Sequence, residues 1–383
     1  MNHPGKSPSH GMRRSGLLGA AALCLGSLLA LANAAAAESA HAKAPAKVSI
    51  FATGLTNPRG LKFGPDGELY VAEGGVGGQH STVGQCEQVE PPVGPYTGDV
   101  HGGGRISRIN ANGFRSTVVG DLPSSQTSPA LGSLISGVAD VAFIGHTLYG
   151  LFAGAGCSHG VAGVPNGIFR VHADGSWNIV ADLGTWQKTH PVAQPSAGDF
   201  EPEGTWYSMV ALRGELYALE PNHGELVRVT TAGRISRVVD ISASEGHAVP
   251  TALAYRGNFY VGNLRTFPIV EGSSKVWKVT PNGRLKVVAE GLTTVLGLAF
   301  DRRGRLYALE NTTGNPGPTP GTGRVVRVHA SGRLEVIAVG LSLPTAMTAG
   351  PDGNLYVSNL GFGAPPVGLG QVLKIEIDAD DDD

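Results

Sequence analysis

Residues 69–73 read Leu-Tyr-Val-Ala-Glu and residues 106–109 read Ile-Ser-Arg-Ile, and both patterns return five more times along the 383-residue chain. The first recurs around six tyrosines, Tyr70, Tyr149, Tyr217, Tyr260, Tyr307 and Tyr356. The second places a basic residue between apolar neighbours, at Arg108, Arg170, Arg228, Lys278, Arg327 and Lys374. Such alternation is typical of a strand with one buried face. The last three tyrosine spacings, 43, 47 and 49 residues, are those of a repeat built from four short strands.

Each copy predicts one four-stranded unit. An apolar strand such as residues 60–63 leads through a tight turn to the Leu-Tyr strand, and the basic strand follows. Five residues beyond the basic position, a glycine ends the turn into a fourth strand, at Gly113, Gly175, Gly233, Gly283 and Gly332. Units of this kind repeated around an axis form a β-propeller. The chain is therefore predicted to be all-β, with a six-bladed propeller over residues 38–377.

The sixth copy stops after Lys374-Ile-Glu-Ile and has no fourth strand of its own. Near the other end of the chain, Ser49-Ile-Phe-Ala-Thr-Gly-Leu resembles the fourth-strand sequence Val336-Ile-Ala-Val-Gly-Leu. We therefore expect the N-terminal strand to complete the last blade. This pairing closes the ring and removes an exposed sheet edge.

Composition excludes several other classes of protein. With 57 Gly, 25 Pro and only 16% charged residues, the chain does not suit a coiled coil or a helical bundle. Its 41% hydrophobic content and net charge of −2 disfavour wholesale disorder. A pI near 6.6 gives no basic face for nucleic acid, so we expect no nucleic-acid partner.

Residues 1–37 have the order of a signal peptide. Arg13 and Arg14 precede an apolar run from Leu17 to Ala32, and small residues follow. The run is short for a membrane span, so we expect export to the periplasm or the extracellular space, by the general or the twin-arginine route, with no span in the mature chain. Removal leaves 26 basic and 31 acidic side chains, a formal charge of −5. The acidic residues 378–383 are expected to form a disordered tail.

Two cysteines remain after removal of the signal, Cys86 and Cys157. In an exported chain an even count permits one disulfide, and two unpaired thiols are the alternative.

The connections between strands divide into two classes. In an antiparallel blade the first-to-second and third-to-fourth turns lie on one face, and these are short. The other face receives the long segments, at 74–104, 121–136, 153–167, 184–204, 264–275, 311–324 and 360–371. Long connections on a rigid scaffold commonly carry function. We therefore expect binding or catalysis on this long-loop face.

One equivalent position on that face stands three residues beyond each repeat tyrosine. It is occupied by Glu73, Phe152, Glu220, Asn263, Glu310 and Asn359. Carboxylate and amide oxygens in a ring around the central opening suit Ca²⁺, which takes six to eight oxygen ligands. The five polar residues are thus candidate metal or ligand-binding residues, and Ca²⁺ is the candidate cofactor. Alternatively, each side chain caps its own loop, as Asn and Asp commonly do at turns.

A second set of polar residues is expected nearer the axis, on the innermost strands. Arg59, Ser208, Thr251 and Thr345 stand at strand ends, and Asp140 lies inside the apolar run 138–143. A buried acid must be paired or hydrogen-bonded, and Arg59 is a candidate partner in a structural pair. The histidines lack metal-site spacing, and the chain has no Gly-x-Ser-x-Gly elbow and no phosphate- or dinucleotide-binding motif.

These segments resemble the ScyD/ScyE family of secreted bacterial proteins over about residues 47–377. The resemblance is carried by the run Gly54-Leu-Thr-Asn-Pro-Arg-Gly-Leu-Lys-Phe, by Gly137-Val-Ala-Asp-Val-Ala-Phe and by Gly370-Gln-Val-Leu-Lys-Ile. More distantly, the repeats are similar to NHL-type and gluconolactonase-type six-bladed propellers. The resemblance implies the fold but no catalytic motif. Gluconolactonase-like enzymes typically begin the first blade with Glu-Gly-Pro, whereas this chain has Asn57-Pro-Arg-Gly at that position. The insert beginning at Cys86 lacks the second nearby cysteine often seen in the family, which Cys157 would replace.

Two functions remain open at this point. The first is a secreted, monomeric binding or scaffold protein that engages a small molecule, glycan or protein through the long-loop face. The second is a Ca²⁺-dependent hydrolase, such as a lactonase or esterase, whose axial carboxylates hold a cation that polarises a carbonyl. No catalytic residue follows from the sequence.

Overall fold

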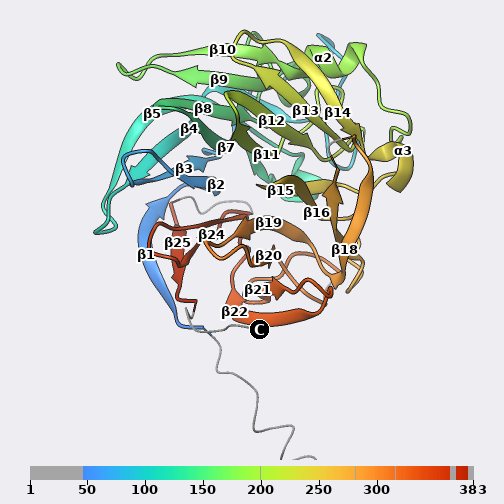
Figure 1. The fold of residues 1–383 in the computed structure, drawn as a ribbon. Coiled ribbons are helices and arrows are strands. Elements are labelled where there is room, and N and C mark those ends of the chain that lie inside the picture. Colours follow the sequence, from blue (N-terminus) through green and yellow to red (C-terminus); the bar gives the residue numbers. More distant parts are fainter. Residues whose placement is uncertain (1–45, 199, 281, 315, 363–367, 378–383) are drawn as a thin grey trace, which may run out of the picture. The chain divides into compact units, whose positions relative to one another are not determined.

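The computed structural model describes residues 46–198, 200–280, 282–314, 316–362 and 368–377, which form six antiparallel β-sheets around a common centre (Figure 1). The predicted all-β six-bladed propeller is thereby confirmed. The signal peptide expected over residues 1–37 and the tail expected over residues 378–383 lie outside the described residues.

The blades follow one another along the chain. Blade 1 contains β2 (Pro58–Phe63), β3 (Leu69–Glu73), β4 (Thr97–Ile109), β5 (Arg115–Gln126) and β6 (Ile135–Ser136). Blade 2 contains β7 (Val138–Ile144), β8 (Thr147–Phe152), β9 (Gly167–Val171) and β10 (Trp177–Asp182). Blade 3 contains β11 (Ser208–Leu212), β12 (Glu215–Glu220), β13 (Glu225–Thr230) and β14 (Ile235–Asp240).

The other three blades are built in the same way. Blade 4 contains β15 (Pro250–Arg256), β16 (Asn258–Asn263), β17 (Ser274–Val279) and β18 (Leu285–Leu292). Blade 5 contains β19 (Val295–Phe300), β20 (Leu306–Glu310), β21 (Gly323–Val328) and β22 (Leu334–Leu341). Blade 6 combines β23 (Ala346–Ala349), β24 (Leu355–Asn359) and β25 (Gly370–Ile375) with β1 (Val48–Leu55). Short helices η1 (Pro129–Leu131), η2 (Cys157–His159), α2 (Leu183–Thr189) and α3 (Ser242–Glu245) lie in connections.

The N-terminal strand closes the ring. β1 pairs antiparallel with β25, with Val48 opposite Ile375 and Leu55 opposite Gly370. The sheet order β1-β25-β24-β23 makes β1 the fourth strand of the last blade, as predicted.

The repeat tyrosines Tyr70, Tyr217, Tyr260 and Tyr356 each pack against an aromatic ring of the next blade. Tyr70 of blade 1 packs edge-on against Phe143 of blade 2, with ring centroids 4.8 Å apart. Tyr356 of blade 6 packs in the same manner against Phe63 of blade 1, at 5.0 Å. The Tyr356 hydroxyl donates to Asp352 in the preceding turn at 3.0 Å. The constant position of the tyrosine in the repeat therefore places an aromatic ring at the interface between blades, where such pairs stabilise packing.

The turn glycines meet the neighbouring blade through their backbone. All five adopt left-handed φ values, and Gly113 and Gly233 both have φ +80. A Cβ atom at Gly113 would lie 2.2 Å from the carbonyl oxygen of Phe51, and one at Gly233 would lie 2.3 Å from that of Val180. Each of these carbonyls belongs to the outermost strand of the preceding blade. Glycine is therefore required both by the turn and by the close approach of two backbones.

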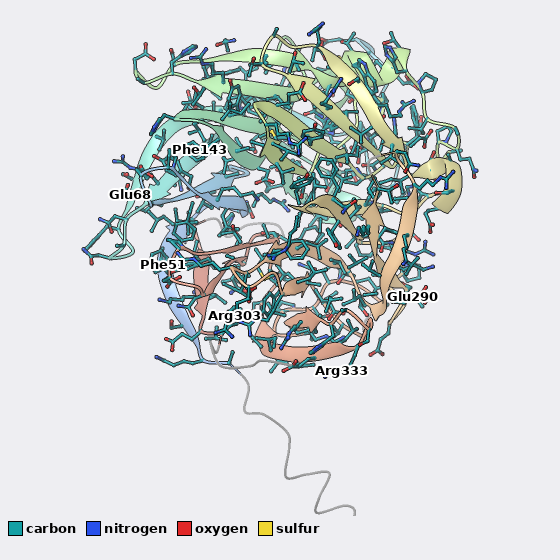
Figure 2. The ribbon with its side chains drawn as sticks, viewed as in Figure 1. Phe51, Glu68, Phe143, Glu290, Arg303 and Arg333 are labelled. Atoms are coloured by element: carbon teal, nitrogen blue, oxygen red, sulfur yellow. A yellow bond between two sulfur atoms is a disulfide. The ribbon has the colours of Figure 1, made fainter. Side chains whose placement is uncertain are left out.

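The core is divided among the blade interfaces. Six clusters of buried apolar side chains each join two neighbouring blades, and the last of them joins Leu55 and Val372 of blade 6 to Leu61 and Val71 of blade 1. Figure 2 shows side chains filling the spaces between the blades. The hydrophobic core is thus a ring of interfaces and closes only when β1 is in place.

The long-loop face differs from the prediction in blade 1. Residues 97–104 and 121–126, expected within the long segments 74–104 and 121–136, extend β4 and β5 instead. Thr97 pairs with Gln126 and Gly104 with Leu122, with register shifts between Asp99 and Gly104. The short strand β6 adds a fifth strand to the expected four. The bulged, glycine-rich ladder explains why strand periodicity was not visible there.

Candidate functional site

The innermost strands of all six blades line a central cavity. β2, β7, β11, β15 and β19 face the centre of the ring in Figure 1. The cavity is small, with a volume of about 20 Å³, and it is partly open to solvent. Its walls are formed by Gly60, Lys62, Asp140, Tyr207, Ser208, Leu253, Leu296, Gly297, Leu298, Ala346 and Met347.

Asp140 is held in this wall by backbone groups and one lysine. Its Oδ1 accepts the N–H of Val141 and its Oδ2 accepts the N–H of Met209, each at 2.8 Å. The cation paired with it is Lys62, whose Nζ lies 3.6 Å from Oδ1. Burial raises the pKa of the Asp140 carboxyl, and Lys62 and the two N–H groups oppose that rise. A Cβ atom at residue 60 would lie 1.9 Å from Oδ1, so Gly60 makes room for the carboxylate.

Arg59, the partner expected for Asp140, has other contacts. Its Nη2 donates to the carbonyl oxygen of Ile135 at 2.5 Å, and its guanidinium lies 5.9 Å from the ring centroid of Phe362. The expected pair is therefore corrected to Lys62–Asp140. The reason is position: Arg59 stands at the beginning of β2, near the long-loop face, whereas Lys62 stands further along the strand.

Tyr207 lies across the central cavity at the end nearest the long-loop face. It immediately precedes the innermost strand of blade 3, and its hydroxyl donates to the carbonyl oxygen of Thr345, next to the innermost strand of blade 6, at 2.9 Å. Blades 3 and 6 lie opposite each other in a six-bladed ring. Burial raises the pKa of Tyr207, and the nearby Arg59 opposes that rise. Sequence reasoning missed Tyr207 because it lies outside the Leu-Tyr repeat.

Two of the three ring carboxylates are paired with arginines from the adjacent strand. Glu73 accepts the N–H of Thr56 at 2.6 Å and pairs with Arg105 at 2.7 Å. Glu310 pairs with Arg324, whose Nη2 lies 3.1 Å from Oε1. Both glutamates are fully buried. Burial raises the pKa of Glu310, and Arg324 opposes that rise.

The third carboxylate is held entirely by backbone groups. Glu220, also fully buried, accepts the N–H groups of Thr205 at 3.0 Å, Asn222 at 3.1 Å and His223 at 2.6 Å. It therefore fixes both the segment that leads into blade 3 and the turn that follows β12.

Asn263 and Asn359, the two asparagines of the set, likewise bind the segments that lead into blades 4 and 6. Asn263 donates to the carbonyl oxygen of Ala248 at 2.8 Å and accepts the N–H of Lys275 at 2.7 Å. Asn359 accepts the N–H of Ser342 at 2.9 Å. Phe152, the apolar member of the set, instead stacks on a neighbouring ring in the core.

The ring positions thus share one local role. Each polar member binds the segment that enters its own blade, as the capping alternative predicts. Among the described residues, no three His, Cys, Asp or Glu side chains gather into a set suited to a metal ion. As folded, the donor set of Glu73, Glu220 and Glu310 fits capping and does not fit an axial cation, because arginine and N–H groups occupy the carboxylate oxygens. The calcium site stays a prediction.

Glu225, which sequence reasoning did not single out, is a fully buried carboxyl on β13 with a strongly raised pKa. Burial raises its pKa to about 7, although Arg237 donates to it at 2.6 Å and opposes the rise. Gln187 of α2 also donates to Glu225, at 3.3 Å. The hydrogen bond between Gln187 and Glu225 anchors the connection between blades 2 and 3 to strand β13 of blade 3.

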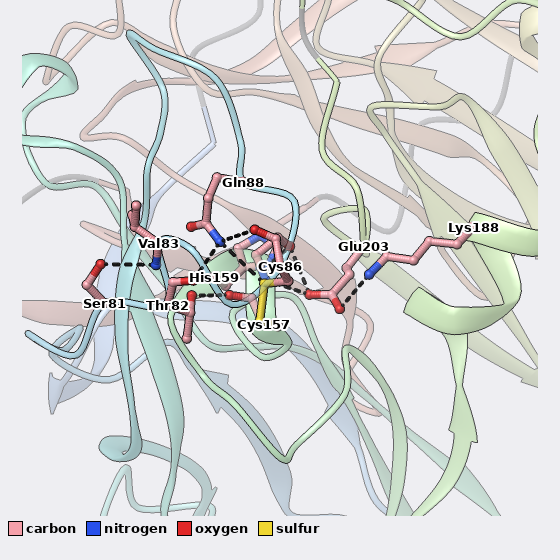
Figure 3. Close-up of a disulfide and its surroundings, with 10 residues drawn as sticks. Ser81, Thr82, Val83, Cys86, Gln88, Cys157, His159, Lys188 and Glu203 are labelled. Atoms are coloured by element: carbon pink, nitrogen blue, oxygen red, sulfur yellow. Dashed lines mark hydrogen bonds and ion pairs between the residues drawn. A yellow bond between two sulfur atoms is a disulfide. The ribbon is translucent and has the colours of Figure 1, made fainter.

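A disulfide joins the long connections of blades 1 and 2. Cys86 and Cys157 are bonded, which confirms one of the two alternatives left open by the sequence. Figure 3 shows the bond among polar contacts, including Thr82, whose hydroxyl donates to the carbonyl oxygen of Cys157. A disulfide suggests folding in an oxidising compartment.

The connection between blades 2 and 3 packs against the same region. Glu203 accepts the N–H of Ser158 at 2.8 Å and pairs with Lys188 at 3.0 Å (Figure 3). Burial works to raise the pKa of Glu203, but these two contacts outweigh it and lower the pKa. Buried His159 lies 3.2 Å from Glu201, which also accepts from Tyr96 at 3.3 Å. Three long connections are therefore tied together by covalent, ionic and hydrogen bonds.

Comparison with solved structures shows the same fold. The chain is similar to a gluconolactonase from Xanthomonas campestris, with TM-score 0.52, 12% identity, and coverage of 86% of this chain and 90% of that one. It is also similar to a putative oxidoreductase (glucose dehydrogenase) from Thermus thermophilus, with TM-score 0.52, 18% identity, and coverage of 86% and 100%. A protein of unknown function from Bacteroides thetaiotaomicron gives TM-score 0.53 at 10% identity, with coverage of 86% and 76%.

These likenesses define the class, a six-bladed β-propeller, and nothing narrower. No protein-family model matches the chain, and no curated protein matches its sequence. Among the described residues, no helix has the length and apolar character needed to span a membrane.

Proposed function

We propose that this protein is an exported binding module whose long-loop face engages another molecule, with a protein partner favoured over a glycan or a small molecule. The observation that carries the proposal is the mutual bracing of the long connections around Cys86–Cys157 and Glu203. Loops fixed in one arrangement lose little conformational entropy on binding, so their contacts contribute more fully to affinity. The resemblance to the ScyD/ScyE family agrees with export, and we propose membership of that family.

Exposed apolar side chains favour a protein as the partner. On the long-loop face, the described connections expose Val76, Val83, Leu131, Phe267, Val270 and Leu369. On the short-turn face, Phe114 is the large apolar side chain exposed among the described residues. Apolar groups presented on ordered loops are typical of protein interfaces.

Matched surface variants test the proposal. The purified chain from residue 38 onward would be immobilised and exposed to fractionated extracellular proteins and to a glycan array. We expect the double variant Phe267→Ser/Val270→Ser to lose about tenfold or more in affinity for a retained partner, and Phe114→Ser to bind as the wild type does. Equal effects of both variants, or no retained partner, would overturn the proposal.

The alternative is a Ca²⁺-dependent hydrolase. Its support is the fold shared with a gluconolactonase at 12% identity, and fold alone does not determine activity. In this alternative Glu73, Glu220 and Glu310 would hold the cation, which would act as a Lewis acid on a carbonyl. Each glutamate would first have to exchange its present hydrogen bonds for the metal. A panel of lactones and esters, assayed with and without added Ca²⁺, tests this activity.

A further inference from the structure

Exposed arginines gather on the short-turn face of three consecutive blades. In each of blades 3–5, the turn after the innermost strand carries an arginine near the axis, and the turn before the outermost strand carries another further out. We call these six exposed residues the arginine surface: Arg213 and Arg234 of blade 3, Arg256 and Arg284 of blade 4, and Arg302 and Arg333 of blade 5. Figure 2 shows Arg333 at the rim of the ring. Two rows of three guanidinium groups therefore cover one half of this face.

The arginines are particular to blades 3–5. The three outer arginines each follow the turn glycine directly, whereas the equivalent position is Phe114 in blade 1 and Ser176 in blade 2. The inner turns of blades 1 and 6 carry the acids Asp66 and Asp352 instead. The repeating fold therefore requires glycine in these turns and does not require arginine beside it.

The positive charge of the arginine surface is not neutralised by neighbouring acids. Within the described ranges of the chain, none of the six arginines forms an ion pair. The acids at this end of blades 3–5 have other partners: Glu215 lies 3.8 Å from Arg228, Asp301 pairs with Arg305, and Glu335 lies 2.7 Å from His329. Because the whole chain has a net charge of −2, this surface is a local concentration of positive charge, which attracts anions.

Contacts with the next blade hold two of the inner arginines in place. The guanidinium of Arg256 lies 5.9 Å from the ring centroid of Phe300, and a Cβ atom at Gly304 would lie 2.0 Å from its Cζ. Arg302, in the same turn as Gly304, donates to the carbonyl oxygen of Pro351 in blade 6. Arg256 and Arg302 are therefore brought close together despite their like charges, and an anion between them would remove the repulsion.

The side chains of these turns suit an extended sugar chain that bears carboxylates. A planar guanidinium binds a carboxylate through two parallel hydrogen bonds. Each outer arginine shares its turn with an exposed polar side chain, which is Thr231 in blade 3, Asn282 in blade 4 and Ser331 in blade 5. Hydroxyl and amide groups both donate and accept hydrogen bonds, as the hydroxyls of a sugar require.

Two other polyanions suit the surface less well. Among the described residues, the turns of blades 3–5 expose no large apolar side chain that could insert into a membrane. The described residues of these turns also include no Phe, Tyr or Trp on which a nucleic-acid base could stack. The net charge of −2 gives no long-range attraction for nucleic acid.

We infer that the arginine surface binds an acidic polysaccharide, whose repeating carboxylates meet the two rows of arginines. The surface lies on the face opposite the long connections. The polysaccharide and the partner proposed for the long-loop face therefore bind independently of each other.

Titration with polygalacturonate tests the surface, using the purified chain from residue 38 onward. We expect saturable binding at low salt that is lost at about 1 M salt, where the screening length falls to about 3 Å. Neutral dextran should not bind. A DNA duplex and phosphatidylglycerol vesicles should bind more weakly than polygalacturonate. Equal or tighter binding of either one, or no binding of polygalacturonate, would overturn the inference.

Matched charge variants locate the binding. Among the described residues, the guanidinium groups of Arg234 and Arg284 form no hydrogen bond or ion pair, so their replacement should leave the fold intact. We expect Arg234→Gln/Arg284→Gln to weaken polygalacturonate binding about tenfold. The control Arg265→Gln/Lys275→Gln removes two positive charges from the long-loop end of blade 4 and should change binding by no more than about twofold. Equal losses in the two variants would show a general attraction between the chain and a polyanion and would contradict the site.

The loop variant Phe267→Ser/Val270→Ser separates this inference from the proposed function. It should bind polygalacturonate as the wild type does, and Arg234→Gln/Arg284→Gln should bind a protein captured by the long-loop face as the wild type does. Loss of polygalacturonate binding in the loop variant would place the polysaccharide on the long-loop face and overturn the inference.

Discussion

The repeating frame of the propeller and its long connections are stabilised in different ways. The frame uses recurring contacts, such as a tyrosine on the next blade's aromatic ring in four blades and a turn glycine beside the preceding blade's outer strand. The long connections do not repeat, and those of blades 1–3 are held by contacts that occur once, the Cys86–Cys157 bond and the Glu203 network. The difference teaches that the frame provides stability through a closed set of interfaces, whereas the connections are free to differ in sequence and so to carry function.

Removal of the closing strand β1 should have the largest effect on stability, because it opens the ring of blades. Deleting residues 38–54 takes away nearly all of β1 and exposes the edge of β25. We expect loss of cooperative unfolding and aggregation, since an unpaired edge strand recruits other chains. Thermal unfolding and light scattering measure this. A shorter deletion of residues 38–45 is the matched control, and full stability of the longer deletion would refute ring closure as the source of stability.

Loss of the disulfide comes next, and it tests the connections. The bond spans 71 residues, and loop-closure entropy predicts a contribution of about 4 kcal/mol to the free energy of unfolding. We expect Cys86→Ser/Cys157→Ser to lower stability by up to that amount and to leave the frame folded. Chemical denaturation gives the stability, and circular dichroism reports the frame. Global unfolding of the double variant would show that frame and connections are not separable.

Glycine substitutions in the frame should cost less and can be compared directly. Gly113 and Gly67 both have φ +80, but a Cβ at Gly113 would lie 2.2 Å from the Phe51 oxygen and one at Gly67 would meet nothing within 4 Å. We expect Gly67→Ala to cost about 1 kcal/mol from backbone conformation alone and Gly113→Ala to cost about 2 kcal/mol more. Denaturant titrations measure both losses. If Gly67→Ala and Gly113→Ala lowered the free energy of unfolding equally, the close contact between Gly113 and the preceding blade would not explain why glycine is needed there.

Chelation should have the smallest effect. The oxygens of Glu73, Glu220 and Glu310 are bonded to their own loops, so we expect EDTA to leave the melting temperature unchanged. A bound Ca²⁺ at a hundredfold excess over its dissociation constant would instead contribute about 2.7 kcal/mol. A fall on chelation that Glu220→Gln or Glu310→Gln abolishes would establish the calcium site and favour the hydrolase.

Sequence could predict what repeats and missed much of what occurs once. The tyrosine, basic and glycine positions located the blades because each contact recurs at a fixed spacing, and β1 was found by its likeness to the other fourth strands. Tyr207 belongs to no repeat, and its partner Thr345 is 138 residues away. Lys62 did carry a signal, because it is the basic residue where the other inner strands place Ala, Val or Thr opposite the repeat tyrosine.

Hydrogen–deuterium exchange with and without a captured partner tests most directly whether the long connections bind the partner while the repeating frame only supports them. If the long-loop face binds, protection on addition of the partner should concentrate in residues 74–96, 153–166 and 264–273, and the turns at 110–114, 231–234 and 329–333 should exchange unchanged. Protection of those short turns, with the long connections unaffected, would contradict the account.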